Sequence, residues 1–173
     1  MSNLPTATAA IARCLGFPEP RVRQLARRLR EAELMPAGAP GVPPDVDHHD
    51  LLTLIIALAS DATLAKAAEA VESYSALTPG GADVTGAPAT VPRTAREALT
   101  AFAELAAEGD ALSSMAIEVV ATWPEIAIRW SDGTVQRFRE TGALASHWAD
   151  SRQRKSVTIP GTAFAAVFKE LFA

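Results

Sequence analysis

The sequence predicts an α+β protein, in which a helical N-terminal domain precedes a small antiparallel sheet of three to four strands flanked by helices. Three observations indicate this class. Apolar residues recur at helical spacing up to about residue 77. Short segments with alternating apolar and polar residues follow residue 114. A stretch rich in glycine and proline separates the two patterns.

The chain begins with two predicted helices joined by a short turn. The first covers residues 6–15, and Gly16 ends it. Pro20 suits the first turn of a second helix over residues 21–35, because a proline there gives up no helical hydrogen bond. The apolar stripe of this second helix consists of Val22, Leu25, Leu29 and Ala32.

The next segment, residues 36–44, is rich in proline and glycine and predicts a loop or a short wing-like excursion. Asp47 is a predicted N-cap, with Asp50 three residues further on. Residues 51–60 are apolar on nearly every side, which indicates a helix in the core or at a contact between subunits. A further helix is predicted over residues 62–77.

Residues 79–93 form the predicted linker, because they combine several glycines and prolines with few charges. They divide the chain into a helical domain, residues 1–78, and an α+β domain, residues 94–173. The second domain begins with a predicted helix over 94–107 and closes with an amphipathic helix over 162–172.

Between these two helices the apolar residues change period. Alternation predicts four strands over residues 115–121, 126–130, 135–139 and 155–159. Asp132 and Gly133 predict a two-residue hairpin turn of type I′, which needs a positive φ at both positions.

The charge of the chain is unevenly distributed. The net charge of -4 disfavours nucleic acid as a partner of the whole protein. However, residues 1–35 hold six Arg against three Glu, a local charge of +3, which leaves -7 for the remainder. Every basic residue of this first segment is Arg, the side chain that binds phosphate and base edges with two parallel hydrogen bonds.

These basic residues lie mostly on the second predicted helix, which follows a short turn. This arrangement is typical of a helix-turn-helix, whose second helix enters the major groove of double-stranded DNA. The alternative is an ordinary helix with a solvated basic face. The candidate DNA-binding residues are Arg21, Arg23, Gln24, Arg27, Arg28 and Arg30.

The segment IARCLGFPEPRVRQLARRLREAELMPAG resembles the helix-turn-helix of small DNA-binding proteins of phage and prophage type. The matching positions are Ala12, Leu15, Gly16, Val22, Leu29, Ala32, Leu34, Pro36 and Gly38. Glu33 departs from the pattern, which usually has glycine at the helix end. The resemblance covers about a fifth of the chain. It implies a sequence-specific transcriptional regulator or a small terminase subunit that recognises phage DNA for packaging.

For the other polar clusters, structural roles are the preferred interpretation. The run of residues 45–50, Asp-Val-Asp-His-His-Asp, contains possible metal ligands, but helix capping explains its carboxylates better. A basic cluster beside Trp148, formed by His147, Arg152, Arg154 and Lys155, could contact a phosphate backbone or support an oligomer contact, but a loop before the last strand is the preferred interpretation. The hairpin arginines 129, 137 and 139 would extend this basic patch if they share a face. The carboxylates Glu118, Glu125 and Asp132 are expected to be solvated.

No nucleophile motif, phosphate-binding glycine loop or paired-carboxylate signature is present in the sequence, so we expect neither an enzyme nor a cofactor. The expected partners are double-stranded DNA and further copies of the chain. The longest apolar run is too short to span a bilayer, and a cytoplasmic protein is expected. A protein-interaction or inhibitor module, in which the Arg-rich helix docks an acidic protein, is the alternative to DNA binding.

Overall fold

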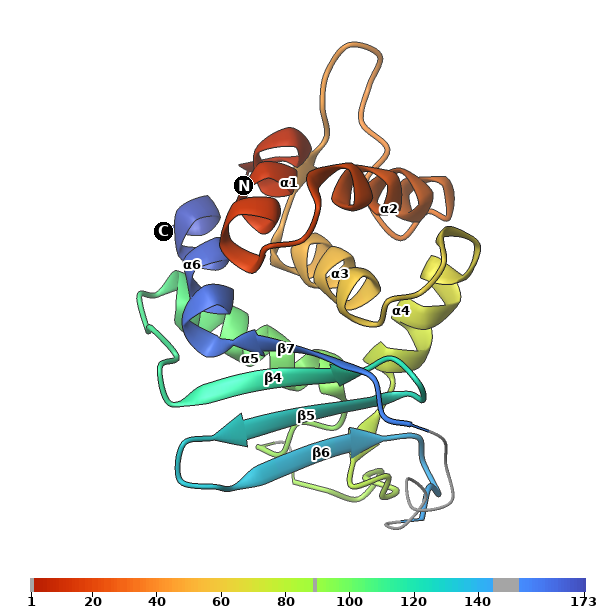
Figure 1. The fold of residues 1–173 in the computed structure, drawn as a ribbon, viewed down its shortest axis with the longest axis vertical. Coiled ribbons are helices and arrows are strands. Elements are labelled where there is room, and N and C mark those ends of the chain that lie inside the picture. Colours follow the sequence, from red (N-terminus) through yellow and green to blue (C-terminus); the bar gives the residue numbers. More distant parts are fainter. Residues whose placement is uncertain (1, 89, 145–152) are drawn as a thin grey trace.

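A computed structural model describes residues 2–88, 90–144 and 153–173 of the chain. These residues form an α+β fold, with N-terminal helices stacked above a five-stranded antiparallel sheet (Figure 1). The predicted fold class is therefore confirmed.

The first two helices lie close to their predicted positions. Helix α1 (Leu4–Leu15) begins after Asn3, whose side chain accepts a hydrogen bond of 2.9 Å from the backbone N–H of Thr6. Gly16, with a φ of 76°, ends the helix. Three residues then lead into helix α2 (Glu19–Glu31).

Helix α2 ends four residues before the predicted end at Met35. Glu33 adopts a left-handed φ of 60°, although it has a side chain where glycine is usual. The backbone N–H of Leu34 then donates to the carbonyl of Leu29, which is the hydrogen bond of a terminated helix. Glu33 thus adopts the left-handed backbone conformation that glycine usually provides at the end of a helix.

Residues 36–44 form a loop that projects from the body of the molecule (Figure 1). Two short antiparallel strands, β1 (Ser2–Asn3) and β2 (Asp45–Val46), pair at its base. These strands were not predicted, because two residues are too few to display alternation. The pairing ties the projecting loop to the start of the chain.

Helix α3 (His48–Ala59) lies at the centre of the protein. Asp47 and Asp50 form the predicted cap, since each side chain accepts the backbone N–H of the other residue at 2.9–3.0 Å. Residues 51–59 are all buried against helices and strands of the same chain. The predicted core position is confirmed, whereas the alternative subunit contact is wrong, because no apolar side of the helix is left for a second copy.

The predicted helix over residues 62–77 consists of two shorter pieces. A 3-10 turn, η1 (Leu64–Lys66), precedes helix α4 (Ala67–Ser75). Tyr74 of α4 is buried, and its hydroxyl donates to the backbone carbonyl of Val120. Burial raises the pKa of Tyr74 to about 12.

The sheet contains the four predicted strands and one more. In the order in which neighbours pair, the strands are β3 (Thr78–Pro79), β6 (Val135–Arg139), β5 (Glu125–Trp130), β4 (Met115–Val120) and β7 (Ser156–Pro160). The predicted two-residue turn between β5 and β6 is wrong. Three residues, 131–133, form the loop, and only Gly133 has a positive φ, so the turn is of type I followed by a bulge.

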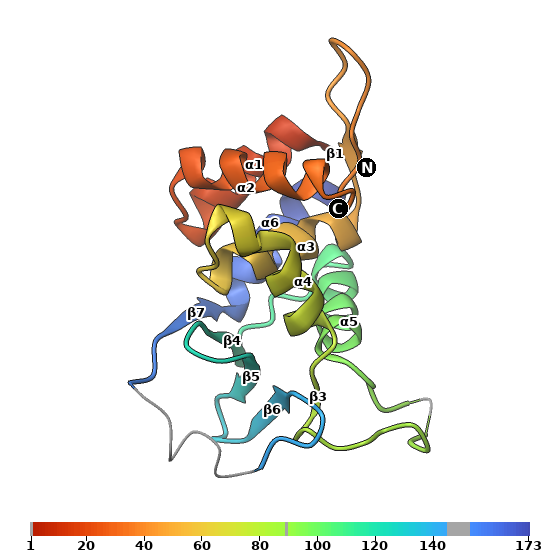
Figure 2. The ribbon, with the colours of Figure 1, turned by 90° about the vertical axis from the view of Figure 1, so that its right-hand side faces the viewer.

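Helices cover one face of this sheet, and the other face carries no helix among the described residues (Figure 2). Helix α5 (Ala95–Ala107) is capped by Thr94, whose hydroxyl accepts a hydrogen bond of 3.1 Å from the backbone N–H of Glu97. Its buried side consists of Leu99 and four alanines, with Phe102 partly buried beside them, whereas Leu105 is 43% exposed.

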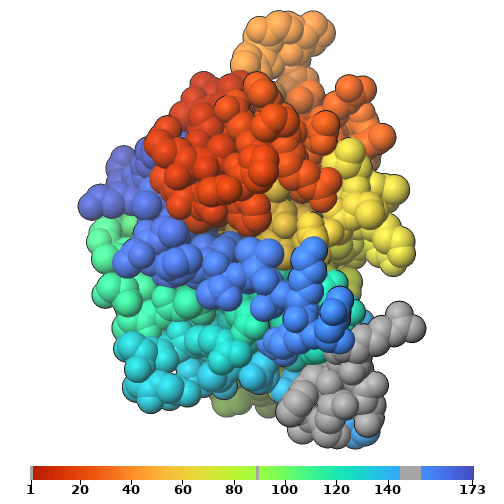
Figure 3. Space-filling view, in the orientation of Figure 1, coloured from red at the N-terminus to blue at the C-terminus, as the bar shows by residue number. Residues whose placement is uncertain are grey.

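Helix α6 (Gly161–Phe172) returns from the sheet to pack against α1 and α5. The space-filling view shows the N-terminal segment, in red, lying against the C-terminal segment, in blue (Figure 3). Buried apolar residues from both sides of the predicted linker form one hydrophobic core. The predicted division at residues 79–93 therefore does not coincide with a division of the core.

Candidate nucleic-acid interface

The candidate DNA-binding residues lie on a helix with one buried and one open side. The apolar stripe of α2 packs against α1, α3 and α4, so the opposite side faces solvent. The side chains of Arg23, Arg27 and Arg28 are 64%, 79% and 54% exposed, and Gln24 is exposed between them. Four of the six candidates therefore share the open side.

The three exposed arginines are paired within the helix. Arg23 lies 3.3 Å from Glu19, and Glu31 receives hydrogen bonds of 2.8 Å from both Arg27 and Arg28. The hydrogen bonds from Arg27 and Arg28 lower the pKa of Glu31. Exposed pairs of this kind stabilise a protein by about 0–1 kcal/mol, so a stronger anion is able to replace the glutamates.

Arg21 and Arg30 occupy different surroundings. Arg21 donates to the backbone carbonyl of Ala62, before η1, and Arg30 Nη2 donates to the carbonyl of Ala37 at 2.8 Å. Both side chains are half-buried. These two arginines therefore hold neighbouring segments against α2, and only the other four candidates lie fully on its exposed side.

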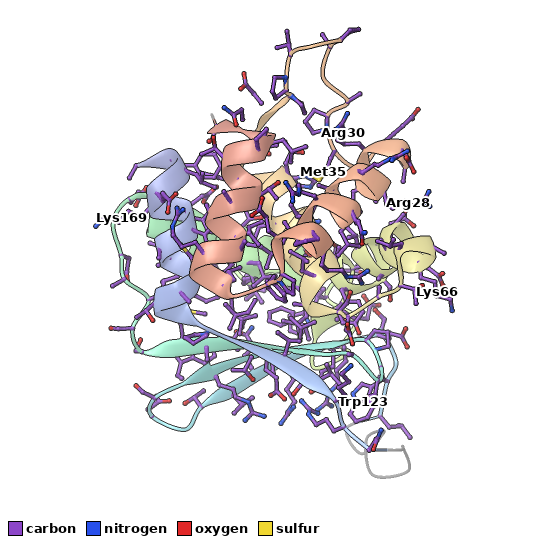
Figure 4. The ribbon with its side chains drawn as sticks, turned by 45° about the horizontal axis from the view of Figure 1, so that its top comes forward. Arg28, Arg30, Met35, Lys66, Trp123 and Lys169 are labelled. Carbon is purple, nitrogen blue, oxygen red and sulfur yellow. The ribbon has the colours of Figure 1, made fainter. Side chains whose placement is uncertain are left out.

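A groove of about 560 Å³ runs between α2, the start of α1 and the projecting loop. Arg23, Arg27 and Arg30 line its helical wall together with Glu19, and residues 37, 39 and 41–44 form the uncharged opposite wall. Arg30 lies at the base of the loop, whereas Arg28 points away from it (Figure 4). The basic side chains of α2 are thus divided between this groove and the outer surface.

The aspartate and histidine run of residues 45–50 serves the structure of α3. Its carboxylates Asp47 and Asp50 cap the helix. The His48 ring packs edge-on against Phe172, with 4.2 Å between the ring centres. Within the described ranges, no group of three His, Cys, Asp or Glu side chains is placed to hold a metal ion.

A second polar cluster lies on the outer face of the sheet, where solvated carboxylates were expected. Glu118 and Glu125 are instead buried, with side chains 8% and 0% exposed. The strand register places Arg129, Arg137 and Arg139 on the same face. The expectation of solvation is wrong for Glu118 and Glu125, because their partners across the strands are not visible in the local sequence, whereas Asp132 is exposed as expected.

Four arginines, Arg129, Arg137, Arg139 and Arg154, pair with these two glutamates. Arg129 Nε lies 2.6 Å from Glu118, and Arg137 Nη1 lies 2.5 Å from Glu125. Arg154 Nη2 bridges both carboxylates at 3.1 Å. Burial alone would raise the pKa of each glutamate, but the hydrogen bonds and charges around them outweigh it, and both pKa values are lowered.

The basic cluster predicted around His147 is described only in part. His147, Trp148, Asp150 and Arg152 lie outside the described residues. Arg154 belongs to the sheet-face cluster, and its guanidinium lies 5.5 Å above the Trp123 ring. Lys155 pairs with Asp61 instead.

Comparison with known protein families, curated proteins and solved structures gives no match for this chain. The described helices include none that is long and apolar enough to cross a membrane.

The sheet-face cluster predicts a loss of stability in acid. Because the pKa values of Glu118 and Glu125 are below the ordinary 4.5, their ion pairs stabilise the fold fully above that pH. This contribution is lost as the pH falls through the lowered pKa values. Urea denaturation at a series of pH values from neutral into acid should record the loss.

The variant Glu125→Gln should lower the free energy of unfolding at neutral pH by about 3–5 kcal/mol, because it leaves the buried Arg139 and the half-buried Arg137 and Arg154 without this carboxylate. Its stability should also depend less on pH. Glu104→Gln, at an exposed position, is the matched control. Equal stability of the two variants would refute a stabilising role for the cluster.

Proposed function

We propose that the protein binds double-stranded DNA in a sequence-specific manner, with α2 as the recognition helix of a helix-turn-helix, and that it acts as a transcriptional regulator. The observation that carries the proposal is the open side of α2, on which three exposed arginines and Gln24 follow a three-residue turn from α1. The positive charge of residues 1–35 in an acidic chain supports the same face as the contact.

The dimensions of α2 suit the major groove. Its 13 residues extend over about 20 Å, which is long enough for the side chains on one side of the helix to contact a few base pairs. Gln24 has the amide that pairs with adenine, and arginine has the fork that pairs with guanine. The proposed contacts are Arg23, Gln24, Arg27 and Arg28, while Arg21 and Arg30 position the helix.

Phosphate binding must compete with the pairs inside α2. A DNA phosphate in reach of Arg27 and Arg28 would replace Glu31 as their partner, and the displaced carboxylate would repel the DNA. Glu31 therefore acts as an internal competitor in this proposal. A regulator of this kind is expected to bind as a symmetric dimer, with the two recognition helices about one helical turn of DNA apart.

The double variant Arg27→Ala, Arg28→Ala should weaken binding to DNA of any sequence, because two phosphate-binding charges are lost. The slope of log affinity against log salt concentration should fall by about 2 in magnitude. Fluorescence anisotropy with a labelled duplex over a salt series measures both quantities. Arg93→Ala with Lys169→Ala removes the same charge from exposed positions elsewhere. An equal effect of the two double variants, or no binding of the unaltered protein at low salt, would refute the proposal.

The variant Glu31→Gln should raise DNA affinity about two- to fivefold, because it frees Arg27 and Arg28 and removes a repelling charge. Glu72→Gln, which makes the same charge change on the exposed side of α4, should leave the affinity nearly unchanged. The same anisotropy titration tests both variants. Weaker binding by Glu31→Gln would show that Glu31 orders the arginines for DNA rather than competing with it.

A further inference from the structure

The outer face of the sheet carries more positive than negative charge. Its cluster contains Arg129, Arg137, Arg139 and Arg154 but only Glu118 and Glu125, which leaves a charge of +2. Within the described part of the chain, no other carboxylate pairs with these four arginines. The cluster is therefore an incompletely neutralised site rather than a balanced set of ion pairs.

Arg139 is the least satisfied member of the cluster. Its side chain is only 8% exposed, and its Nε lies 3.5 Å from Glu125, which is close enough for charge attraction. That contact lacks hydrogen-bond geometry, so the buried Nε–H has no hydrogen-bond acceptor among the described residues. A buried donor of a charged group that lacks an acceptor destabilises the fold, and a bound acceptor would remove this penalty.

The strand register brings the arginines together over a small residue. Arg137 and Arg139 are alternate residues of β6 and lie on one face, about 7 Å apart along the strand. Arg137 is paired with Ala127 of β5, and Arg129 is its diagonal neighbour on the same side. Because the side chain of Ala127 is only a methyl group, the longer side chains of Arg129 and Arg137 have room to extend above it.

We propose that this face binds a phosphate group of a small ligand, held by Arg129, Arg137 and Arg139. A phosphate monoester carries about two negative charges at neutral pH and three strong acceptor oxygens, which match the excess charge and the unsatisfied Nε–H of Arg139. The buried carboxylates of Glu118 and Glu125 hold these guanidinium groups in place through their ion pairs. This site is independent of DNA binding by α2, and neither proposal requires the other.

Isothermal titration with inorganic phosphate tests the site, with sodium chloride at equal ionic strength in the blank titration. Saturable binding of one phosphate per chain is expected for the unaltered protein. The variant Arg129→Gln with Arg137→Gln should weaken this binding at least about tenfold. The control with the same charge change, Arg93→Gln with Lys169→Gln, should bind phosphate normally. Circular dichroism confirms that each variant is folded.

Two further variants make the result decisive. Arg129→Gln alone leaves Arg154 on Glu118 and all partners of Glu125, so it keeps the buried carboxylates paired while it removes one ligand of the phosphate. It should still weaken phosphate binding. Arg27→Ala with Arg28→Ala should bind phosphate normally, and loss there would assign the phosphate to the α2 face and overturn the proposal. No saturable binding, or equal binding by the sheet-face and control variants, would also overturn it.

Discussion

The fold depends on the burial of α3, a helix whose residues 51–59 have no solvent-exposed side. A helix of this kind has to be enclosed, and neither the N-terminal helices nor the sheet encloses it alone. Helices α2 and α4 cover it from one side, while α5 and strands β4 and β7 cover it from the other. The C-terminal helix α6 completes the enclosure of the core by packing on α1. Two segments with different sequence patterns thus share one core.

This enclosure places the charged residues at opposite ends of the molecule. The exposed side of α2 lies at one end, where weak pairs within the helix hold the arginines. The outer sheet face lies at the other end, where arginines surround two buried carboxylates. Exposure makes the first set exchangeable for an external anion, whereas burial makes the second set a fixed arrangement whose excess charge an anion can neutralise. The two proposed binding surfaces therefore differ in their physical character.

The sequence predicted those elements whose pattern is local. Periodicity and caps located most helices, including the paired aspartates before α3, and alternation located four strands. It missed the short strands β1, β2 and β3, which exist only through pairing with distant residues. The exposed arginines of α2 were identified from the local charge. The sheet-face cluster was missed because Glu118 meets Arg129 and Arg154 only after strand pairing, and no local signal reveals that neighbourhood.

The helical and the sheet-containing parts form one unit around α3. All three tryptophans, at 123, 130 and 148, lie in the C-terminal part, whereas far-UV circular dichroism reports mainly on helices, most of which are N-terminal. Urea unfolding followed by tryptophan fluorescence and by circular dichroism tests directly whether the two parts unfold together. A shared core predicts that the two transitions coincide in midpoint and slope. Separate transitions, with the tryptophans responding at a different urea concentration from the helices, would contradict it.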